Sequence, residues 1–164
     1  MDADERLDRT DIRILAALQT EGRLTNKALA ERIALSPSAC LERVRRLEAA
    51  GVVSGYRAIL DLTRVGAHLE VFAEVTLEGL SQTDKEAFEQ AVRAAPEVVS
   101  ADAVGGDRDY VLRFLVRDLA AYEAASQRLL DGGLGIKQLM SSFVIRRIKP
   151  DSPPALEDLT GIGR

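Results

Sequence analysis

Apolar residues recur at helical spacing along the N-terminal part of the chain. Between residues 8 and 20 this period predicts a first helix, which Gly22 ends. Thr25 is suited to be the N-cap of a second helix that runs through Ile33, because its hydroxyl can accept a hydrogen bond from the first turn. Two amphipathic helices are therefore expected before the first break in the pattern.

A third helix is predicted directly after a short turn. Ser36 would be its N-cap and Pro37 its first residue, where the missing N–H of proline has no cost. Gly51 ends this helix. Its inward face is predicted to consist of Cys40, Val44 and Leu47. Cys40 is expected to be a small core residue rather than a redox sensor.

The pattern then changes from helical to alternating. Residues 52–62 are predicted to be a β-like connector, after which strands and helices follow one another. Strands are predicted at residues 71–77, 98–104, 110–116 and 136–148, with helices at 81–95 and 119–130. The alternation in 110–116 directs Tyr110 and every second residue after it to one face, with Val111, Arg113, Leu115 and Arg117 on the other.

This order of elements predicts an α+β fold. A helix-turn-helix domain, winged-helix-like, at residues 1–52 is followed by a β connector at 53–67 and a ferredoxin-like βαββαβ domain at 68–149. A proline-containing tail, 150–164, is expected to be extended or mobile. One face of the ferredoxin-like sheet lacks helices, so we expect another subunit to cover it.

Charge and composition narrow the class of protein. The net charge of −4 and pI of about 5.2 argue against a protein that coats DNA by bulk charge, but allow a local basic patch. The single cysteine fits a reducing compartment. The N-terminus does not read as a signal peptide, and no apolar run approaches the roughly 18 residues of a membrane span. We expect a soluble cytoplasmic protein.

The third helix carries the candidate chemistry. A short helix after a tight turn, with a polar N-terminus and arginines on one face, is the form that enters a DNA major groove. Arg43 is a candidate for a bidentate contact to guanine, whereas Arg45 and Arg46 are expected to meet phosphates. The predicted DNA-contacting residues are Thr25, Ser36, Ser38, Ala39, Glu42, Arg43, Arg45 and Arg46. The alternative is a solvated helix stabilised weakly by a Glu42–Arg46 pair.

Other polar residues of the chain indicate no specific binding site. The acidic residues Asp2, Asp4 and Asp8 are expected to be solvated. His68 is the only histidine, so no metal site can be assembled from the usual soft ligands, and no cofactor is predicted.

Together these residues resemble the leucine-responsive/AsnC family of bacterial and archaeal transcription regulators, also called feast/famine proteins. The resemblance covers nearly the whole chain. It is carried by GRLTNKALAERIALSPSACLERVRRLEAAGVVSGYRAILD, by the GGDRDYVL turn and by the final SSFVIRRIK segment.

The resemblance implies a sequence-specific regulator that binds double-stranded DNA. It implies homodimers built through the second domain, which often assemble further into octamers or similar rings. It also implies an amino acid effector bound at subunit interfaces. The positions that match the effector-binding turn and final strand are Gly106, Asp107, Asp109 and Ser141. From the residues alone, the 105–109 segment is better explained as a hairpin turn that needs positive φ; the resemblance makes the effector-binding interpretation about equally favoured.

Some residues depart from the family pattern. Ala34 occupies the turn where relatives often carry Gly, and Leu139 the first of two positions where they commonly carry Thr or Ser. Arg146 and Arg147 replace a pair that is frequently acidic.

Two other functions compete with the regulator. An architectural DNA-wrapping protein with weak sequence preference would use the same helix. Some proteins that resemble this family are sirohaem decarboxylases, but such an enzyme would need histidine or other basic groups around a tetrapyrrole. With a single histidine and a well-formed recognition helix, we expect a protein that is not an enzyme.

Overall fold

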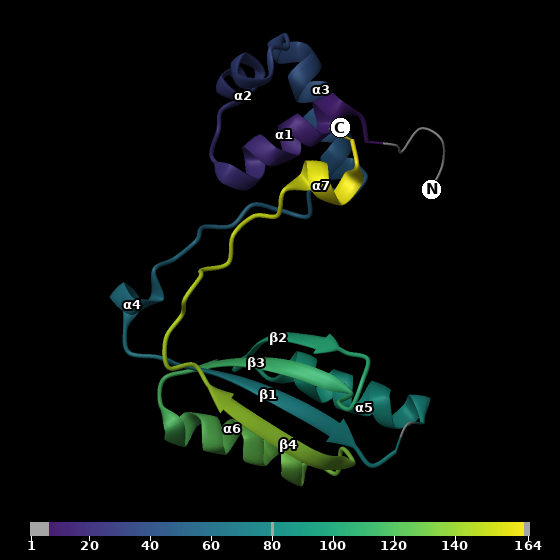
Figure 1. Ribbon diagram of the computed structural model, residues 1–164, viewed down its shortest axis with the longest axis vertical. Coiled ribbons are helices and arrows are strands. Elements are labelled where there is room, and N and C mark those ends of the chain that lie inside the picture. The colour runs from purple at the N-terminus through teal and green to yellow at the C-terminus, as the bar shows by residue number, and fades with distance from the viewer. Residues whose placement is uncertain (1–6, 80, 163–164) are drawn as a thin grey trace. The chain divides into compact units, whose positions relative to one another are not determined.

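The computed structural model describes residues 7–79 and 81–162 of the chain. They divide into two compact units. One contains the residues up to Ile59 together with those from Lys149 onward, and the other is Leu60–Ile148 (Figure 1). No helix in the described ranges is both long enough and apolar enough to cross a membrane.

The first unit is built from three helices that begin where the sequence predicts. They are α1 (Arg9–Thr20), α2 (Asn26–Ile33) and α3 (Pro37–Ala49). Thr25 and Ser36 cap α2 and α3 as expected, each accepting a hydrogen bond from a backbone N–H of the first turn. The buried residues at the centre of these helices are Ile14, Ala17, Leu29, Ala30, Ile33, Cys40 and Leu47. The predicted role of Cys40 as a core residue is confirmed by its exposure of 0%.

The turn between α2 and α3 depends on a left-handed residue. Ala34 has φ 59° and ψ 47°, and it is the only non-glycine residue with positive φ in the described chain. Its N–H donates to the carbonyl oxygens of Ala30 and Glu31, which closes the end of α2. The chain thereby reverses quickly enough to start α3 at Pro37.

The second unit is the expected four-stranded sheet with two long helices. Its elements are β1 (Leu69–Leu77), α5 (Gln82–Ala94), β2 (Val98–Ala103), β3 (Tyr110–Val116), α6 (Leu119–Asp131) and β4 (Ile136–Phe143). The strands lie in the order β2-β3-β1-β4, and every neighbouring pair is antiparallel. This is the predicted ferredoxin-like arrangement.

The two faces of the sheet have different chemistry. Helices α5 and α6 lie on the same face of the sheet (Figure 1). The side chains buried against them include Val71, Val75, Phe88, Leu112 and Phe114. No helix of the described unit covers the opposite face, where the side chains of Phe72 and Met140 are 38% and 42% exposed. The alternation predicted for Tyr110–Val116 is confirmed, since its burial follows every second residue.

Three predicted elements are wrong in detail. The β connector at 53–67 contains no strand, and its only regular element is the short helix α4 (Leu62–Val65). Strand β4 ends at Phe143 instead of Ile148. Val144 still donates a hydrogen bond to the Glu70 carbonyl, but β1 begins at Leu69, so residues 146–148 have no strand residue opposite them. The tail is not extended throughout, since α7 (Leu156–Thr160) forms within it and packs against α1.

Candidate nucleic-acid interface and effector loop

Two polar side chains, one at the start of α3 and one at the start of α2, hold the first turn of α3 by hydrogen bonds. The Ser36 hydroxyl accepts from the Ala39 N–H at 3.3 Å, and the Asn26 side-chain amide donates to the Pro37 carbonyl at 2.8 Å. Thr25 and Ser36, two of the predicted DNA contacts, are therefore capping residues. Both side chains are exposed, and a hydroxyl that accepts from the backbone can still donate to a phosphate.

An exposed strip runs along α3 on the side away from the core. It consists of Ser38, Glu42 and Arg45, which are all exposed, with the partly exposed Ala39 beside it. The spacing of four and then three residues places the strip on one face of the helix. The predicted inward residues lie opposite, with Cys40 and Leu47 at 0% and 2% exposure. We call Ser38, Ala39, Glu42 and Arg45 the α3 strip.

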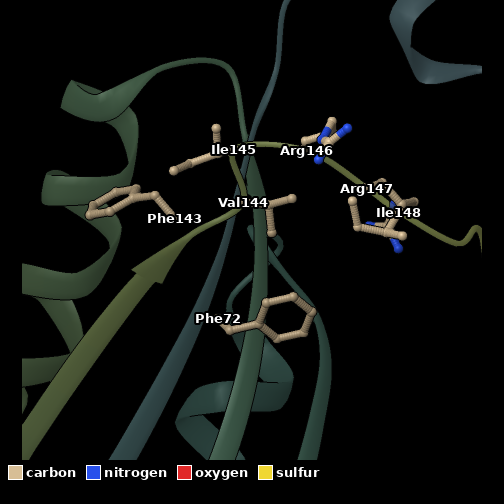
Figure 2. Close-up of a pocket in the computed structure, with 7 residues that line it drawn as sticks. All are labelled: Phe72, Phe143, Val144, Ile145, Arg146, Arg147 and Ile148. Atoms are coloured by element: carbon tan, nitrogen blue, oxygen red, sulfur yellow. The ribbon is translucent and has the colours of Figure 1, made fainter.

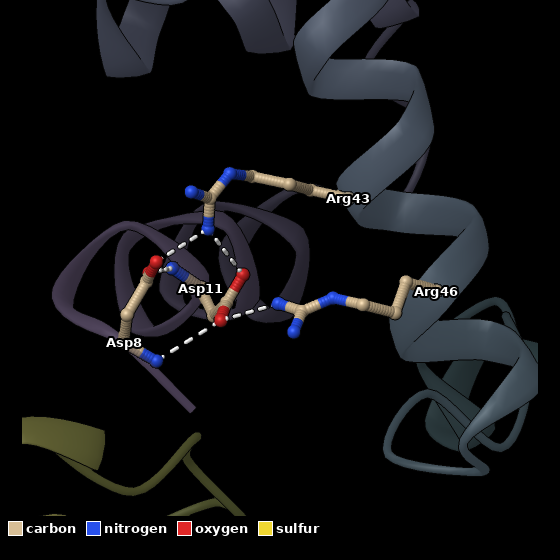
Figure 3. A network of polar contacts seen from close by, with 4 residues as sticks. All are labelled: Asp8, Asp11, Arg43 and Arg46. Carbon is tan, nitrogen blue, oxygen red and sulfur yellow. Dashed lines mark hydrogen bonds and ion pairs between the residues drawn. The ribbon is translucent and has the colours of Figure 1, made fainter. Parts of the chain in front are cut away.

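Arg43 and Arg46 lie to the side of this strip and are held by acidic residues of the first helix. Arg43 donates to Asp8 at 2.6 Å and to Asp11 at 2.9 Å, while Arg46 donates to Asp11 at 2.6 Å (Figure 3). Asp11 is completely buried. The alternative pairing of Arg46 with Glu42 is thus replaced by an ion pair across two helices. We call Asp8, Asp11, Arg43 and Arg46 the α1–α3 cluster.

Asp8 is half exposed to solvent, as predicted, but it also makes hydrogen bonds that the prediction did not include. Its carboxylate accepts the Asp11 N–H at 2.8 Å, its own N–H donates to Asp11 at 3.0 Å, and the two form a capping box. Asp2 and Asp4, predicted to be solvated with it, lie outside the described residues. The spacing of two aspartates three residues apart at a helix start was the available signal for this box.

The contacts of the α1–α3 cluster shift the pKa values of Asp8 and Arg43. Partial burial acts to raise the pKa of Asp8, but hydrogen bonds from the Asp11 N–H and from Arg43 outweigh it and hold that pKa below its ordinary value. Hydrogen bonds to Asp8 and to Asp11 raise the pKa of Arg43. Burial raises the pKa of the Cys40 thiol, which keeps it protonated and unreactive.

The predicted effector residues of the 105–109 loop have different surroundings. Gly106 has φ 122°, so the hairpin turn by itself explains why this position is a glycine, independently of any bound ligand. The Asp109 carboxylate accepts the Leu77 N–H at 2.9 Å, and the Asp109 N–H donates to the Val75 carbonyl. Asp107 is exposed, so its carboxylate is the one that faces solvent.

Ser141 lies elsewhere in the same unit. It pairs with Ala73 across β4 and β1, and its hydroxyl is 2.5 Å from the hydroxyl of Tyr122 on α6. Since β1 separates β4 from β3, Ser141 is more than about 10 Å from the 105–109 loop, two strand spacings away. The structure therefore does not bring Ser141 next to the other three predicted effector residues within one subunit.

A wide hollow of about 590 Å³ lies where β4 gives way to the following segment. It is lined by Phe72, Phe143, Val144, Ile145, Arg146, Arg147 and Ile148 (Figure 2). Ile145 and Ile148 are 97% and 77% exposed. Apolar side chains this exposed are typical of a surface that another molecule covers. The Arg147 guanidinium pairs with the buried carboxylate of Glu70.

Within the described residues no three His, Cys, Asp or Glu side chains are grouped so as to hold a metal ion. The His68 ring nitrogen lies 3.3 Å from the Gly66 carbonyl oxygen, a contact that explains its position without a ligand.

Comparison with protein families matches both parts of the chain. Residues 7–54 match the winged helix-turn-helix DNA-binding model, and residues 70–154 match the Lrp/AsnC ligand binding domain. The Bkd operon transcriptional regulator of Pseudomonas aeruginosa is 39% identical over 150 residues, which cover 92% of this chain and 98% of that protein. The leucine-responsive regulatory protein of Escherichia coli K12 is 39% identical over 143 residues, covering 87% of each chain.

Solved structures agree over almost the whole length. A transcriptional regulator from Neisseria meningitidis in complex with L-Met matches with a TM-score of 0.84 and 41% identity, covering 94% of this chain and 99% of that one. A feast or famine regulatory protein from M. tuberculosis complexed with L-methionine matches with a TM-score of 0.83 and 33% identity, covering 92% and 99%. With its helix-turn-helix unit and its four-stranded second unit, the chain belongs to the Lrp/AsnC family of DNA-binding transcriptional regulators.

Proposed function

We propose that the α3 strip is the surface that reads DNA. The observation that supports this most directly is the exposure of Ser38, Glu42 and Arg45 on one face of a helix whose other face is buried. Near the N-terminus of α3, Ser38 and Ala39 are short enough for the backbone to approach base edges. Arg45 follows two turns later and would neutralise a phosphate.

The capping hydroxyls and the two flanking arginines have different parts in this proposal. Thr25 and Ser36 begin α2 and α3, where exposed N–H groups and the helix dipole attract phosphate oxygens. Arg43 and Arg46 contact Asp8 and Asp11, so we assign base reading to the strip rather than to them. Their direct contact with DNA stays a prediction from the sequence.

We infer that the second unit binds a free amino acid and that the ligand alters DNA binding. Two structural relatives are complexes with methionine, and a relative of similar length is named as leucine-responsive. In the 105–109 loop, the exposed carboxylate of Asp107 is suited to pair with an α-ammonium group. Because Ser141 is distant from this loop within one chain, a site that uses both would take them from different subunits.

The regulator would work as a homodimer, and larger rings such as octamers remain a prediction from the family resemblance. A two-fold dimer sets the separation of two α3 helices and therefore favours a roughly palindromic DNA site. An effector bound at a subunit interface acts only if its affinity differs between the arrangements of the assembly. A regulator of this kind works where the genomic DNA lies, so we propose a cytoplasmic location.

The first experiment is in vitro selection of bound DNA from a random pool. We expect a roughly palindromic consensus. The Ser38→Ala and Arg45→Ala variants should lose about 5- to 150-fold in affinity for the selected site, since each removes about 1–3 kcal/mol of contact. Arg93→Ala is the matched control, because Arg93 is an exposed arginine of α5 in the other unit. Bound DNA without a consensus would support the architectural alternative, and no bound DNA would refute the α3 assignment.

A second experiment addresses the effector with free L-methionine and L-leucine as probes. Calorimetry should detect binding of at least one, and the Asp107→Asn variant should weaken it about tenfold or more by removing the partner of the ammonium group. Asp131→Asn is the control, since Asp131 is an exposed carboxylate of α6 that accepts a hydrogen bond from Gln127. Equal affinities in wild type and Asp107→Asn would refute the role of Asp107.

A further inference from the structure

The α1–α3 cluster is the most densely connected group of charges in the first unit. The buried carboxylate of Asp11 accepts from the Asp8 N–H at 3.0 Å, from Arg43 at 2.9 Å and from Arg46 at 2.6 Å. Arg43 reaches across to Asp8 as well, at 2.6 Å. Figure 3 shows both guanidinium groups directed at the start of α1, with Asp11 between them.

This arrangement decides which arginines of α3 are available to DNA. The helix carries three, and the contacts of Arg43 and Arg46 are with carboxylates of α1. Arg45, by contrast, has no carboxylate within ion-pair distance among the residues that the structure describes. Two carboxylates facing two guanidinium groups leave the cluster close to neutral. The positive charge that α3 offers to a phosphate is therefore concentrated at Arg45.

A buried carboxylate also fixes geometry. Removing one partner of a buried ion pair leaves a charge without compensation, so Asp11 strongly favours the one placement of α3 that keeps both arginines within reach. The two contacts are one helical turn apart along α3, at Arg43 and Arg46. Two points of attachment on a helix restrict both its rotation about its axis and its sliding past α1.

We propose that Asp11, assisted by Asp8, is a specificity-determining positioning residue. It holds α3 so that the α3 strip faces DNA, and it keeps Arg43 and Arg46 from binding phosphates of any sequence. This inference rests on the proposal that α3 is the DNA-reading helix. Freed from Asp11, the two arginines would add contacts to the backbone, which raise affinity for all DNA and carry no sequence information.

The test uses Asp11→Asn and Asp8→Asn, with Glu31→Gln as the control for loss of a negative charge on an exposed residue of the same unit. Affinities for the selected site and for random-sequence DNA are measured by fluorescence anisotropy between 50 and 300 mM salt. Each arginine that gains a phosphate steepens the dependence of log Kd on log salt by about 0.9. We expect a change of about 1–2 for Asp11→Asn on random DNA, and a specific-to-random affinity ratio reduced roughly tenfold.

If Asp11 only stabilised the fold, Asp11→Asn would change neither the salt dependence nor the affinity ratio. A rescue experiment distinguishes this stabilising role from the positioning role. Adding Arg43→Gln and Arg46→Gln to Asp11→Asn should return the salt dependence to the wild-type value, because the released cations are gone. Should Asp11→Asn fail to fold, Asp8→Asn keeps a capping side chain and removes one of the two carboxylates that hold Arg43, for an expected change of up to about 0.9. Folded variants with wild-type salt dependence and affinity ratio would overturn the proposal.

Comparison of Arg45→Ala with Asp11→Asn distinguishes a failure of this inference from a failure of the proposed function. If Arg45→Ala weakens binding to the selected site while Asp11→Asn changes nothing, the DNA-reading surface stands and the positioning role fails. If neither Arg45→Ala nor Ser38→Ala affects binding, α3 is not the reading helix and both proposals fail together.

Discussion

At the scale of single residues, Ala34 has an unfavourable backbone conformation. Its φ of 59° and ψ of 47° lie in the left-handed region, where a Cβ atom comes too close to the following carbonyl oxygen. The turn nevertheless forms, because the flanking helices bury Leu29, Ile33 and Cys40 together. Packing thus compensates for a local conformation that alanine disfavours.

The Ala34→Gly variant is therefore expected to be more stable than wild type by about 0.5–1 kcal/mol. Glycine removes the strain of roughly 1–2 kcal/mol, and part of the gain is lost to its greater freedom in the unfolded chain. Chemical denaturation followed by circular dichroism measures the change. Ala28→Gly in the adjacent helix α2 is the control and should be destabilising by about 1 kcal/mol. A loss of stability in Ala34→Gly would show that the turn carries no strain.

The residue scale also shows where sequence patterns stop being informative. Helical periodicity correctly assigned Cys40 and Leu47 to the core and Ser36 to the cap, because each depends on residues close in sequence. The same periodicity places Arg46 on the outward face and Arg43 at its edge. Their ion pairs join positions more than thirty residues apart, and no local pattern encodes which helix approaches from the side.

At the scale of elements, α1 is held to α3 by charge as well as by apolar packing. Asp8 has a pKa below its ordinary value, so in the folded state it remains ionised at a pH where it would be protonated in the unfolded chain. Its contribution to stability is fully present above the unfolded pKa of about 3.9 and is lost as pH falls through the lower folded pKa. The size is small, below about 1 kcal/mol, since the side chain is half exposed.

Acid titration of the Asp8→Asn variant tests this contribution. Asparagine keeps the helix cap but does not titrate, so the gap in stability between wild type and variant should be present at pH 6 and shrink below about pH 4. Urea denaturation at several pH values measures it. Other carboxyls with lowered pKa values, such as Glu97 and Asp118, are present in both proteins. Their contributions cancel when the free energy of unfolding of the variant is subtracted from that of wild type. A gap that is constant down to pH 2.5 would contradict the linkage.

The elements that the sequence mispredicts are those that need a partner to exist. Residues 53–67 include Val53, Tyr56 and Ile59, residue types that favour strands, but within the described chain no neighbouring strand pairs with them. Strand β4 ends at Phe143, close to the start of its partner β1 at Leu69, so the predicted residues 146–148 have no strand beside them. Helix α7 is the opposite case, because its short segment follows prolines and was not predicted to be helical, yet it forms a helix that packs on α1. Pairing and packing across the chain decide such segments, and local propensity does not.

At the scale of the whole molecule, the uncovered face of the sheet carries both apolar and charged side chains. Phe72 and Met140 are about two-fifths exposed, while Arg108 pairs with Glu74 and Arg113 pairs with Glu70 on the same face. A face that holds acidic and basic residues together can match its own copy rotated by a two-fold axis. We therefore propose a second copy of this chain as its cover.

Replacing both apolar residues in the Phe72→Glu, Met140→Glu variant should convert dimers to folded monomers. Burying two new carboxylates per subunit would cost several kcal/mol, more than an interface of ordinary size can spare. Light scattering after size-exclusion chromatography gives the mass, and circular dichroism checks the fold. Leu130→Glu, at an equally exposed apolar residue of α6 on the opposite side, should keep the wild-type mass. Dimers that persist in the double variant would place the interface elsewhere.

Because α7 belongs to the same compact unit as α1, the chain enters the second unit near Leu60 and returns to the first after Ile148. The sheet unit is thus topologically an insertion, joined to the helical unit by an outgoing and a returning segment. One protease cut in residues 53–59 would leave the C-terminal fragment attached to α1 through α7, and a second cut near Lys149 would be needed to free the sheet. A fluorophore placed after Thr160 would accordingly report on the DNA-reading half of the molecule, although the ligand-binding half precedes it in sequence.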